Sequence, residues 1–280
     1  MLQNYLNSFD WADTTRDRYA FILGKFLADC PDPVDLDPAD LLSWLNAHSE
    51  WGSSTRVLAL SVIKGFISWR YGSQHPALIV KLKRRKSKIQ RSLDLEQVGR
   101  LLASFDTSKP KGRRDLAMAA LFLDAGLRVS ELARLDLRDL DLVRCHLDVI
   151  VKGGDWGRGV FSENTANFIF SWLADREQIA AAGVFAVFVS THRNAGHPMK
   201  RASIGRLVGS WAEICDLTVL SPHDFRRTFA TLSTRFGAPA RVVQEAGRWR
   251  SPEMVERYTP AITSEDFRSY FPVKGAMGDF

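Results

Sequence analysis

SPHDFRRTFATLSTRFGAPARVVQEAGRWRSPEMVERY, residues 221–258, is the stretch on which the rest of the chain depends. It opens with Ser221 and Pro222, a capping residue followed by the residue best suited to the first position of a helix. His223 and Arg226 follow three residues apart, so they project from the same face of that helix. The sequence therefore predicts a helix that presents an imidazole and a guanidinium side by side.

The same stretch continues through two further short helices. Gly237 and Gly247 predict helix ends, Trp249 follows, and 251–258 predicts a helix that carries Tyr258. An imidazole, a guanidinium, an indole and a phenol suit a phosphodiester, because they supply donors for the phosphate oxygens, a proton acceptor and a hydroxyl able to attack. The same residue types are also common as helix-capping and packing residues, so this stretch alone leaves both interpretations open.

Length and composition favour a protein of two domains. The chain has 280 residues, of which 45% are hydrophobic and 25% charged, as in ordinary globular proteins. It has no apolar run of membrane-spanning length, and its first residues lack the pattern of a signal peptide, so we expect a cytoplasmic protein without a membrane partner. Cys30, Cys145 and Cys215 lie far apart and lack metal-ligand spacing, so we expect neither a disulfide nor a metal site.

Positive charge is concentrated in one short segment. Residues 1–80 carry six Lys and Arg against nine Asp and Glu, a balance of −3, whereas residues 93–280 carry 25 against 23, a balance of +2. Residues 81–92, KLKRRKSKIQRS, carry seven basic residues and no acid. A basic segment between two domains favours a polyanionic partner, because it could lie along a phosphate backbone. Its candidate contacts with DNA are Lys83, Arg84, Arg85, Lys86, Lys88 and Arg91.

Residues 1–80 are predicted to be all helical. Thr14 or Thr15 can cap a first long helix, and further helices follow over 38–48 and from residue 53. Helices of this length form a small bundle. Four cations on them are candidates for DNA contact or, equally, for solvated surface: Arg16, Arg18, Arg56 and Lys64.

An arginine at a turn between two buried helices marks the second half of the chain. The nearly apolar run that ends at Gly126 predicts a buried helix over 113–125, and Ser130 and Glu131 begin the next helix. Arg128 lies at the turn between them, where a charge taken out of water needs an anion. That anion could be Glu131 or the phosphate of a ligand, and the residues leave both open.

The remaining elements predict a mainly helical domain with a small β-sheet. Alternating apolar residues over 141–161 predict a β-hairpin with Lys152 at its tip, and 185–189 predicts a short strand. Helices are expected over 95–104, 163–182 and 202–215. A lysine at a hairpin tip usually serves solubility, so its chemistry depends on what surrounds it.

Four blocks of this sequence resemble the signature blocks of the tyrosine recombinases, also called phage integrases. They are AGLRVSEL (125–132), VKGG (151–154), HDFRRTFAT (223–231) and AGRWRSPEMVERYT (246–259), in the order of the family and at similar separations. The resemblance implies a mainly α fold with a small β-sheet. Its parts would be an N-terminal helical core-binding (SAM-like) domain at 1–80, a basic linker at 81–92, and an α+β catalytic domain at 93–280 with its tail at 264–280.

Carried over by position, the resemblance implies an active site of six residues: Arg128, Lys152, His223, Arg226, Trp249 and Tyr258. Glu131 matches the acidic position that orients Arg128. Trp249 stands where the family more often has His, and an indole N–H can donate to a phosphate oxygen but cannot transfer a proton. Arg227 stands where His is commoner, and it either adds a contact to DNA phosphate or faces solvent.

The resemblance also implies DNA strand exchange by transesterification. Tyr258 would attack a backbone phosphate, form a 3′-phosphotyrosyl link and release a 5′-hydroxyl, with no metal, ATP or other cofactor. The expected partner is double-stranded DNA, bound in the prokaryotic nucleoid by a homotetramer that holds two duplexes, alone or with a partner recombinase. Two alternatives remain: DNA relaxation like that of a type IB topoisomerase, and a DNA-binding protein of the same fold without catalysis.

Overall fold

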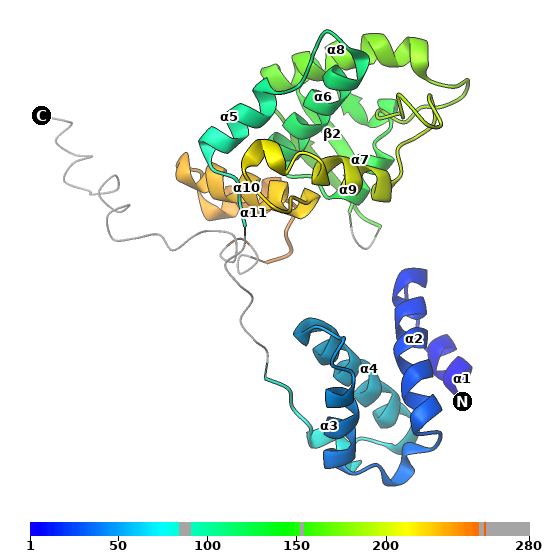
Figure 1. Ribbon diagram of the computed structural model, residues 1–280. Helices are drawn as coiled ribbons and strands as arrows, with labels where there is room; N and C mark the ends of the chain where they lie inside the picture. Colours follow the sequence, from blue (N-terminus) through cyan, green and yellow to red (C-terminus); the bar gives the residue numbers. More distant parts are fainter. Residues whose placement is uncertain (84–90, 152–153, 252–254, 256–280) are drawn as a thin grey trace, which may run out of the picture. The chain divides into compact units, whose positions relative to one another are not determined.

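The computed structural model describes residues 1–83, 91–151, 154–251 and 255 (Figure 1). The chain divides into two compact units, Met1–Lys88 and Ile89–Phe280, and each has its own hydrophobic core. Helices predominate and the described sheet has three strands. The prediction of a mainly helical fold with a small β-sheet is therefore confirmed. No helix in the described part of the chain is long and apolar enough to cross a membrane.

The N-terminal unit is a bundle of helices whose core includes Phe26 and Phe66, both almost inaccessible to solvent. Its elements are α1 (Leu2–Asn7), α2 (Asp13–Asp29), η1 (Pro33–Asp35), α3 (Pro38–Ala47), α4 (Ser53–Tyr71) and η2 (Pro76–Ile79). The predicted caps Thr14 and Thr15 are wrong, because α2 already begins at Asp13 and its N-cap is Ala12. The carboxylate of Asp13 supplies negative charge to the first turn, which favours a helix start without a side-chain cap.

The C-terminal unit combines helices with the sheet. Its helices are α5 (Leu95–Ala103), α6 (Pro110–Ala125), α7 (Val129–Arg134), η3 (Leu137–Asp139), α8 (Glu163–Ile179), α9 (Arg201–Gly209), η4 (Glu213–Cys215), α10 (Pro222–Arg235) and α11 (Ala240–Ala246). Its strands are β1 (Leu140–Asp141), β2 (His146–Ile150) and β3 (Trp156–Val160).

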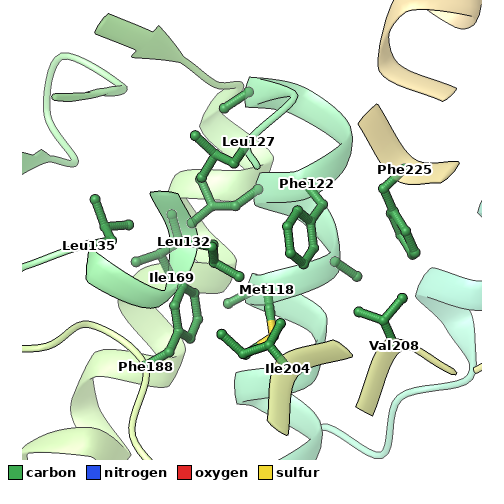
Figure 2. Packing of buried hydrophobic residues seen from close by; sticks show 14 of the residues in the cluster. Met118, Phe122, Leu127, Leu132, Leu135, Ile169, Phe188, Ile204, Val208 and Phe225 are labelled. Carbon is green, nitrogen blue, oxygen red and sulfur yellow. The ribbon is translucent and has the colours of Figure 1, made fainter. Parts of the chain in front are cut away.

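Helix α6 is the central element of the C-terminal unit, and it packs against both α8 and α10. Its Met118 and Phe122 lie among side chains from four other helices (Figure 2). These neighbours include Leu132 of α7, Ile169 of α8, Ile204 of α9 and Phe225 of α10. The rings of Phe122 and Phe225 are 5.7 Å apart between centroids. Because every residue from Leu116 to Phe122 is apolar and buried, the other helices assemble around this part of α6.

The turn that follows α6 is fixed by its contact with α10. Gly126 adopts a left-handed conformation with φ of 55°, as the sequence predicts for a helix end. A Cβ added to Gly126 would lie 2.5 Å from the ring of Phe229, so a side chain would clash as well as strain the backbone. Glycine therefore lets α10 approach the turn that carries Arg128.

The sheet is antiparallel in the order β1-β2-β3. Leu147 pairs with Gly159 and Val149 pairs with Gly157, so all four residues face the same side of the hairpin. Leu147 and Val149 are buried, while the two glycines leave space beside them. The β2–β3 turn is closed by the N–H of Val151, which donates to the carbonyl of Asp155 at 2.8 Å.

Two predicted elements are shorter than the sequence suggested. The segment 185–189 forms only isolated bridges, Asp136↔Ala186 and Val189↔Pro198, because its two ends pair with different parts of the chain and neither pairing continues as a ladder. The helix predicted over 202–215 ends at Gly209 and resumes as η4. The apolar spacing misled the prediction because the irregular turn still buries Trp211 and Cys215.

Candidate active site

The start of α10 is held by a hydrogen-bonded cap. The carboxylate of Asp224 accepts bonds from the N–H and the hydroxyl of Ser221, at 2.9 and 2.7 Å. Thr228 adds a tie to the start of the unit, because its hydroxyl accepts from the N–H of Leu93 at 2.8 Å. This cap fixes the helical turn from which His223 and Arg226 project.

Arg226 joins two turns that are far apart in the sequence. Its side chain is nearly inaccessible, with 2% of the residue exposed. One guanidinium nitrogen donates to the carbonyl of Gly126 and another to the carbonyl of Gly247. The guanidinium also lies 4.3 Å from the centre of the Trp249 ring, which suits a cation–π contact. The turn before Arg128 and the turn before Trp249 are thereby brought to one place.

Arg128 is paired with Glu131, which is one of the two anions that the sequence offered for it, the other being the phosphate of a ligand. The Nη1 of Arg128 donates to Oε1 of Glu131 at 2.6 Å, and the Arg128 N–H donates to Oε2 at 2.9 Å. The side chain of Arg128 is 32% exposed, whereas that of Glu131 is 2% exposed. Arg128 therefore still reaches solvent, so the pair leaves the second alternative, a ligand phosphate, available.

Glu131 is held in its charged form by two arginines. Burial on its own raises the pKa of this carboxyl, but the attraction of Arg248 and the hydrogen bonds and charge of Arg128 outweigh it and lower the pKa below its usual value. Arg248 approaches the same carboxylate at 3.3 Å. A buried carboxylate with two cationic partners is a rigid support for the half-buried Arg128.

Arg248 is the member of this group that sequence reasoning missed. Its side chain is 6% exposed, and burial lowers the pKa of its guanidinium although Glu131 opposes the shift. The backbone of Arg248 is left-handed, with φ of 55°, whereas Gly247 before it keeps the right-handed conformation. The available sequence signal was the spacing of Gly157 and Gly159 in β3, since these glycines leave the space that Arg248 fills.

His223 lies at the surface beside three arginines. The residue is exposed, yet partial desolvation, followed by the charges of Arg227 and Arg226, lowers its pKa below the ordinary value of 6.5. Arg128 lowers the pKa further, while Asp224 opposes the shift. The neutral imidazole is therefore favoured near pH 7, which suits a proton acceptor.

Trp249 is buried in a small cluster at the end of α11. Its ring stacks near that of Phe229, with 6.1 Å between centroids, and 5% of the residue is exposed. Gly247 makes room for this ring, because a Cβ added there would lie 1.8 Å from it. Val255, which precedes Tyr258 by three residues, is helical and buried in the same cluster.

The remaining predicted site residues fall into two groups, of which the first lies outside the described residues. This first group consists of Lys152, Tyr258, Arg84, Arg85, Lys86 and Lys88, together with the tail 264–280. The second group consists of predicted DNA contacts that the structure describes. Among these, Arg18 and Lys83 are exposed, while Lys64 donates to the carbonyl of Leu78 and so is held within the N-terminal unit.

Four further cations predicted to contact DNA are at least partly enclosed by protein. Arg56 donates to the side chain of Asn46 at 3.2 Å, Arg91 donates to the carbonyl of Val219, and Arg227 pairs with Asp224 at 3.1 Å. The Nε of Arg16 is buried. The contacts of Arg56, Arg91 and Arg227 give these three side chains structural roles, and contact with DNA remains a prediction for all four. Within the described ranges, no group of three or more His, Cys, Asp or Glu side chains is placed to hold a metal ion.

Solved structures share this fold. The structure of the Tn1549 transposon integrase in complex with transposon right end DNA matches with a TM-score of 0.76, over 99% of this chain and 98% of that chain, at 17% sequence identity. In sequence, residues 91–265 match the model of the phage integrase family. The chain belongs to this family.

Two curated relatives are tyrosine recombinases by name. Tyrosine recombinase XerC of Vibrio parahaemolyticus is 33% identical over 174 residues, which are 62% of this chain and 55% of that protein. Tyrosine recombinase XerC of Corynebacterium efficiens is 30% identical over 273 residues, which are 93% of this chain and 86% of that protein. The match thus spans little more than half of the first relative and most of the second.

Proposed function

We propose that this chain is a site-specific DNA recombinase, which cuts and rejoins strands by transesterification through a 3′-phosphotyrosyl intermediate. The observation that carries the proposal is the position of Arg226 between the carbonyls of Gly126 and Gly247. It draws Arg128, His223 and Trp249 from distant parts of the sequence toward one surface. Membership of the phage integrase family and the names of the XerC relatives support the same reaction.

Each side chain has a distinct task in this reaction. The phenol oxygen of Tyr258 forms a bond to the scissile phosphorus while the bond to the 5′-oxygen breaks. His223, favoured in its neutral form, accepts the phenol proton, and Lys152 donates a proton to the departing 5′-oxygen. The bond energy is conserved in the protein–DNA link, so a 5′-hydroxyl can reverse the step.

The cations stabilise the negative charge that develops on the phosphate oxygens. Arg128 is the accessible one, and Glu131 fixes its planar guanidinium in a chosen direction. Arg226 contributes its charge from just beneath the surface. Preorganised donors of this kind are each worth about 10²–10³ in rate in other enzymes, because they need no rearrangement when the charge appears.

The proposed assembly follows from the family. The two units and the basic segment 81–92 bind duplex DNA, mainly through phosphate contacts, and four copies of the chain hold two duplexes, with or without a partner recombinase. The setting is the nucleoid of a prokaryotic cytoplasm.

A nicked duplex tests the proposal. A binding sequence is first selected by the protein from a random pool of duplexes, and nicks are then placed at successive positions so that the released 5′-end can diffuse away. The wild-type protein should form a covalent adduct that survives denaturing electrophoresis, whereas Tyr258→Phe should form none and bind the duplex with unchanged affinity.

Two results would contradict the proposal. Failure of the wild-type protein to form an adduct at any nick position would leave only DNA binding. Relaxation of supercoiled plasmids without sequence preference, together with adducts on any duplex, would indicate a topoisomerase instead.

A further inference from the structure

We propose that Arg248 is a positioning residue of this active site, which acts on the scissile phosphate through Glu131 and Arg128. The inference rests on the proposed function and adds a residue to its machinery. Arg248 holds the Glu131 carboxylate in place, and it balances the charge of that carboxylate so that the charge of Arg128 stays available to phosphate.

The guanidinium of Arg248 connects three elements of the C-terminal unit. Its Nη2 donates to the carbonyl of Ala125, the last residue of α6, at 2.9 Å and to Oε2 of Glu131 at 3.3 Å. Its Nη1 donates to the carbonyl of Ala246 at 2.8 Å and to that of Arg158 in β3 at 3.4 Å. One side chain therefore fixes the end of α6, the support of Arg128 and the hairpin relative to each other.

Strand β3 is shaped to accept this side chain. A Cβ on Gly157 would lie 2.8 Å from Cδ of Arg248, and a Cβ on Gly159 would lie 3.1 Å from its Nη1. The same Cβ atoms would also crowd Val151 at 2.9 Å and Leu147 at 3.0 Å, so a side chain at either position would need Arg248 or these neighbours to shift. The two glycines on one face of β3 thus leave room for Arg248 to pass across the strand beside the side chains of Val151 and Leu147.

The backbone of Arg248 gives no reason for an arginine. A left-handed conformation with φ of 55° favours glycine, and an arginine adopts it only at a cost in strain. The side chain, 6% exposed, also has little surface with which to touch DNA. Its bonds to Ala125 and Glu131 therefore account for the residue.

Charge explains why Glu131 needs a second arginine. The pair of Arg128 and Glu131 alone has no net charge, so the carboxylate would weaken the attraction of Arg128 for a phosphate. With Arg248 on the other side of the carboxylate, the three residues carry a net charge of +1. Arg248 thereby serves both orientation and electrostatics without contact with substrate.

The test separates binding from chemistry. Arg248→Gln and Arg248→Gly, the second of which suits the left-handed backbone, are compared with wild type on the selected duplex. Affinity is measured on the intact duplex, and the rate of covalent adduct formation is measured in single turnover on the nicked duplex. Both variants should bind within about threefold of wild type, yet form the adduct about 100-fold more slowly, because small displacements of a catalytic group have effects of this size.

Two further variants identify the route of the effect. Arg248→Lys keeps the charge and should recover part of the lost rate. Glu131→Gln combined with Arg248→Gln should lose much less than the product of the two single losses, because the residues act as one unit.

Arg176 provides a matched control. Arg176 lies in α8 and is also a buried arginine, with 6% of the residue exposed. It donates to the backbone carbonyls of Ala186 and Val184, which follow that helix. Arg176→Gln should lower the thermal unfolding temperature, because it removes two buried hydrogen bonds, but leave the adduct rate of the folded protein unchanged.

The outcomes distinguish this inference from the proposed function. If the wild-type protein forms no adduct, the proposed function fails and the role of Arg248 fails with it. If the wild type forms the adduct and both Arg248 variants match its rate, only the role of Arg248 is overturned. The role is also overturned if the rate falls merely in proportion to the loss of folded protein.

Discussion

In the proposed reaction, the protonation of His223 should decide at which pH the site can act. Its pKa is lowered by partial desolvation and by Arg227 and Arg226, so the neutral form persists to a more acidic pH than in the unfolded chain. We expect the rate of adduct formation to fall toward acidic pH as His223 becomes protonated, with the free protein losing its neutral imidazole only below pH 6.5. A bound phosphate, being an anion, should raise that pKa and move the fall to higher pH.

Two measurements check this expectation. The imidazole of His223 is followed by NMR across the pH range, with His223→Gln to assign its signal, and the single-turnover rate is measured at the same pH values. His223→Gln should lose the acid limb and react about 10²–10⁴-fold more slowly. A titration of His223 above pH 6.5 in the free protein would contradict the expectation. Because protonation is weaker in the folded state, this residue also disfavours folding as the pH falls below 6.5.

The absence of a side chain at Gly247 allows the Trp249 ring to occupy its position. A Cβ at this position would lie 1.8 Å from the indole, so Gly247→Ala must displace the ring from Arg226 and Phe229. We expect a loss of about 1–3 kcal/mol in the free energy of unfolding, as for overpacked cores, together with a slower adduct rate. Gly205 in α9 has open space around it, so Gly205→Ala should be neutral or slightly stabilising. Equal unfolding curves for the two variants would refute the assignment.

Among the elements, α10 carries the largest share of the site, and its N-terminus should be sensitive. Ser221→Ala removes a hydroxyl from the cap and should lower the free energy of unfolding by about 1 kcal/mol. The variant should also slow the adduct rate, because His223 and Arg226 lie in the first turns of this helix. Ser162 caps α8, which carries none of the proposed catalytic residues. Ser162→Ala should therefore lower the free energy of unfolding by a similar amount but leave the adduct rate unchanged. Unfolding by denaturant and single-turnover rates compare the two.

Helix ends with a strong local signal were predicted well. Ser221 and Pro222 place the start of α10, and Gly126 ends α6 in the conformation that glycine favours. Long-range pairing decided one failure, because 185–189 lacks a continuous partner strand. The caps at Thr14 and Thr15 and the unbroken helix over 202–215 failed on local signals instead. The contacts of Arg248 could not be predicted either, because its partners Ala125 and Glu131 lie more than a hundred residues earlier in the chain.

At the scale of the whole molecule, two acidic or nearly neutral parts flank a strongly basic segment. Residues 1–80 have a net charge of −3 and residues 93–280 of +2, against +7 for 81–92. Since several cations elsewhere already have protein partners, among them Lys64 and Arg227, the basic segment should supply much of the attraction for DNA phosphates. Contacts of this kind release counterions, which makes their contribution measurable through salt.

Neutralising four residues of this segment, Lys83, Arg84, Arg85 and Lys86, to glutamine should weaken DNA binding and flatten its salt dependence. Each lost phosphate contact removes about 0.9 from the slope of log affinity against log salt concentration, so the slope should change by up to about 4. Arg91 is kept, because it bonds to the carbonyl of Val219 and its loss could disturb the C-terminal unit. The control is Lys109→Gln, which removes an exposed cation already paired with Asp106. It should change the slope by less than the value of about 0.9 that one phosphate contact contributes. A slope unchanged by the fourfold substitution would show that the phosphates are bound elsewhere, and the basic segment would then be only a connection between two DNA-binding units.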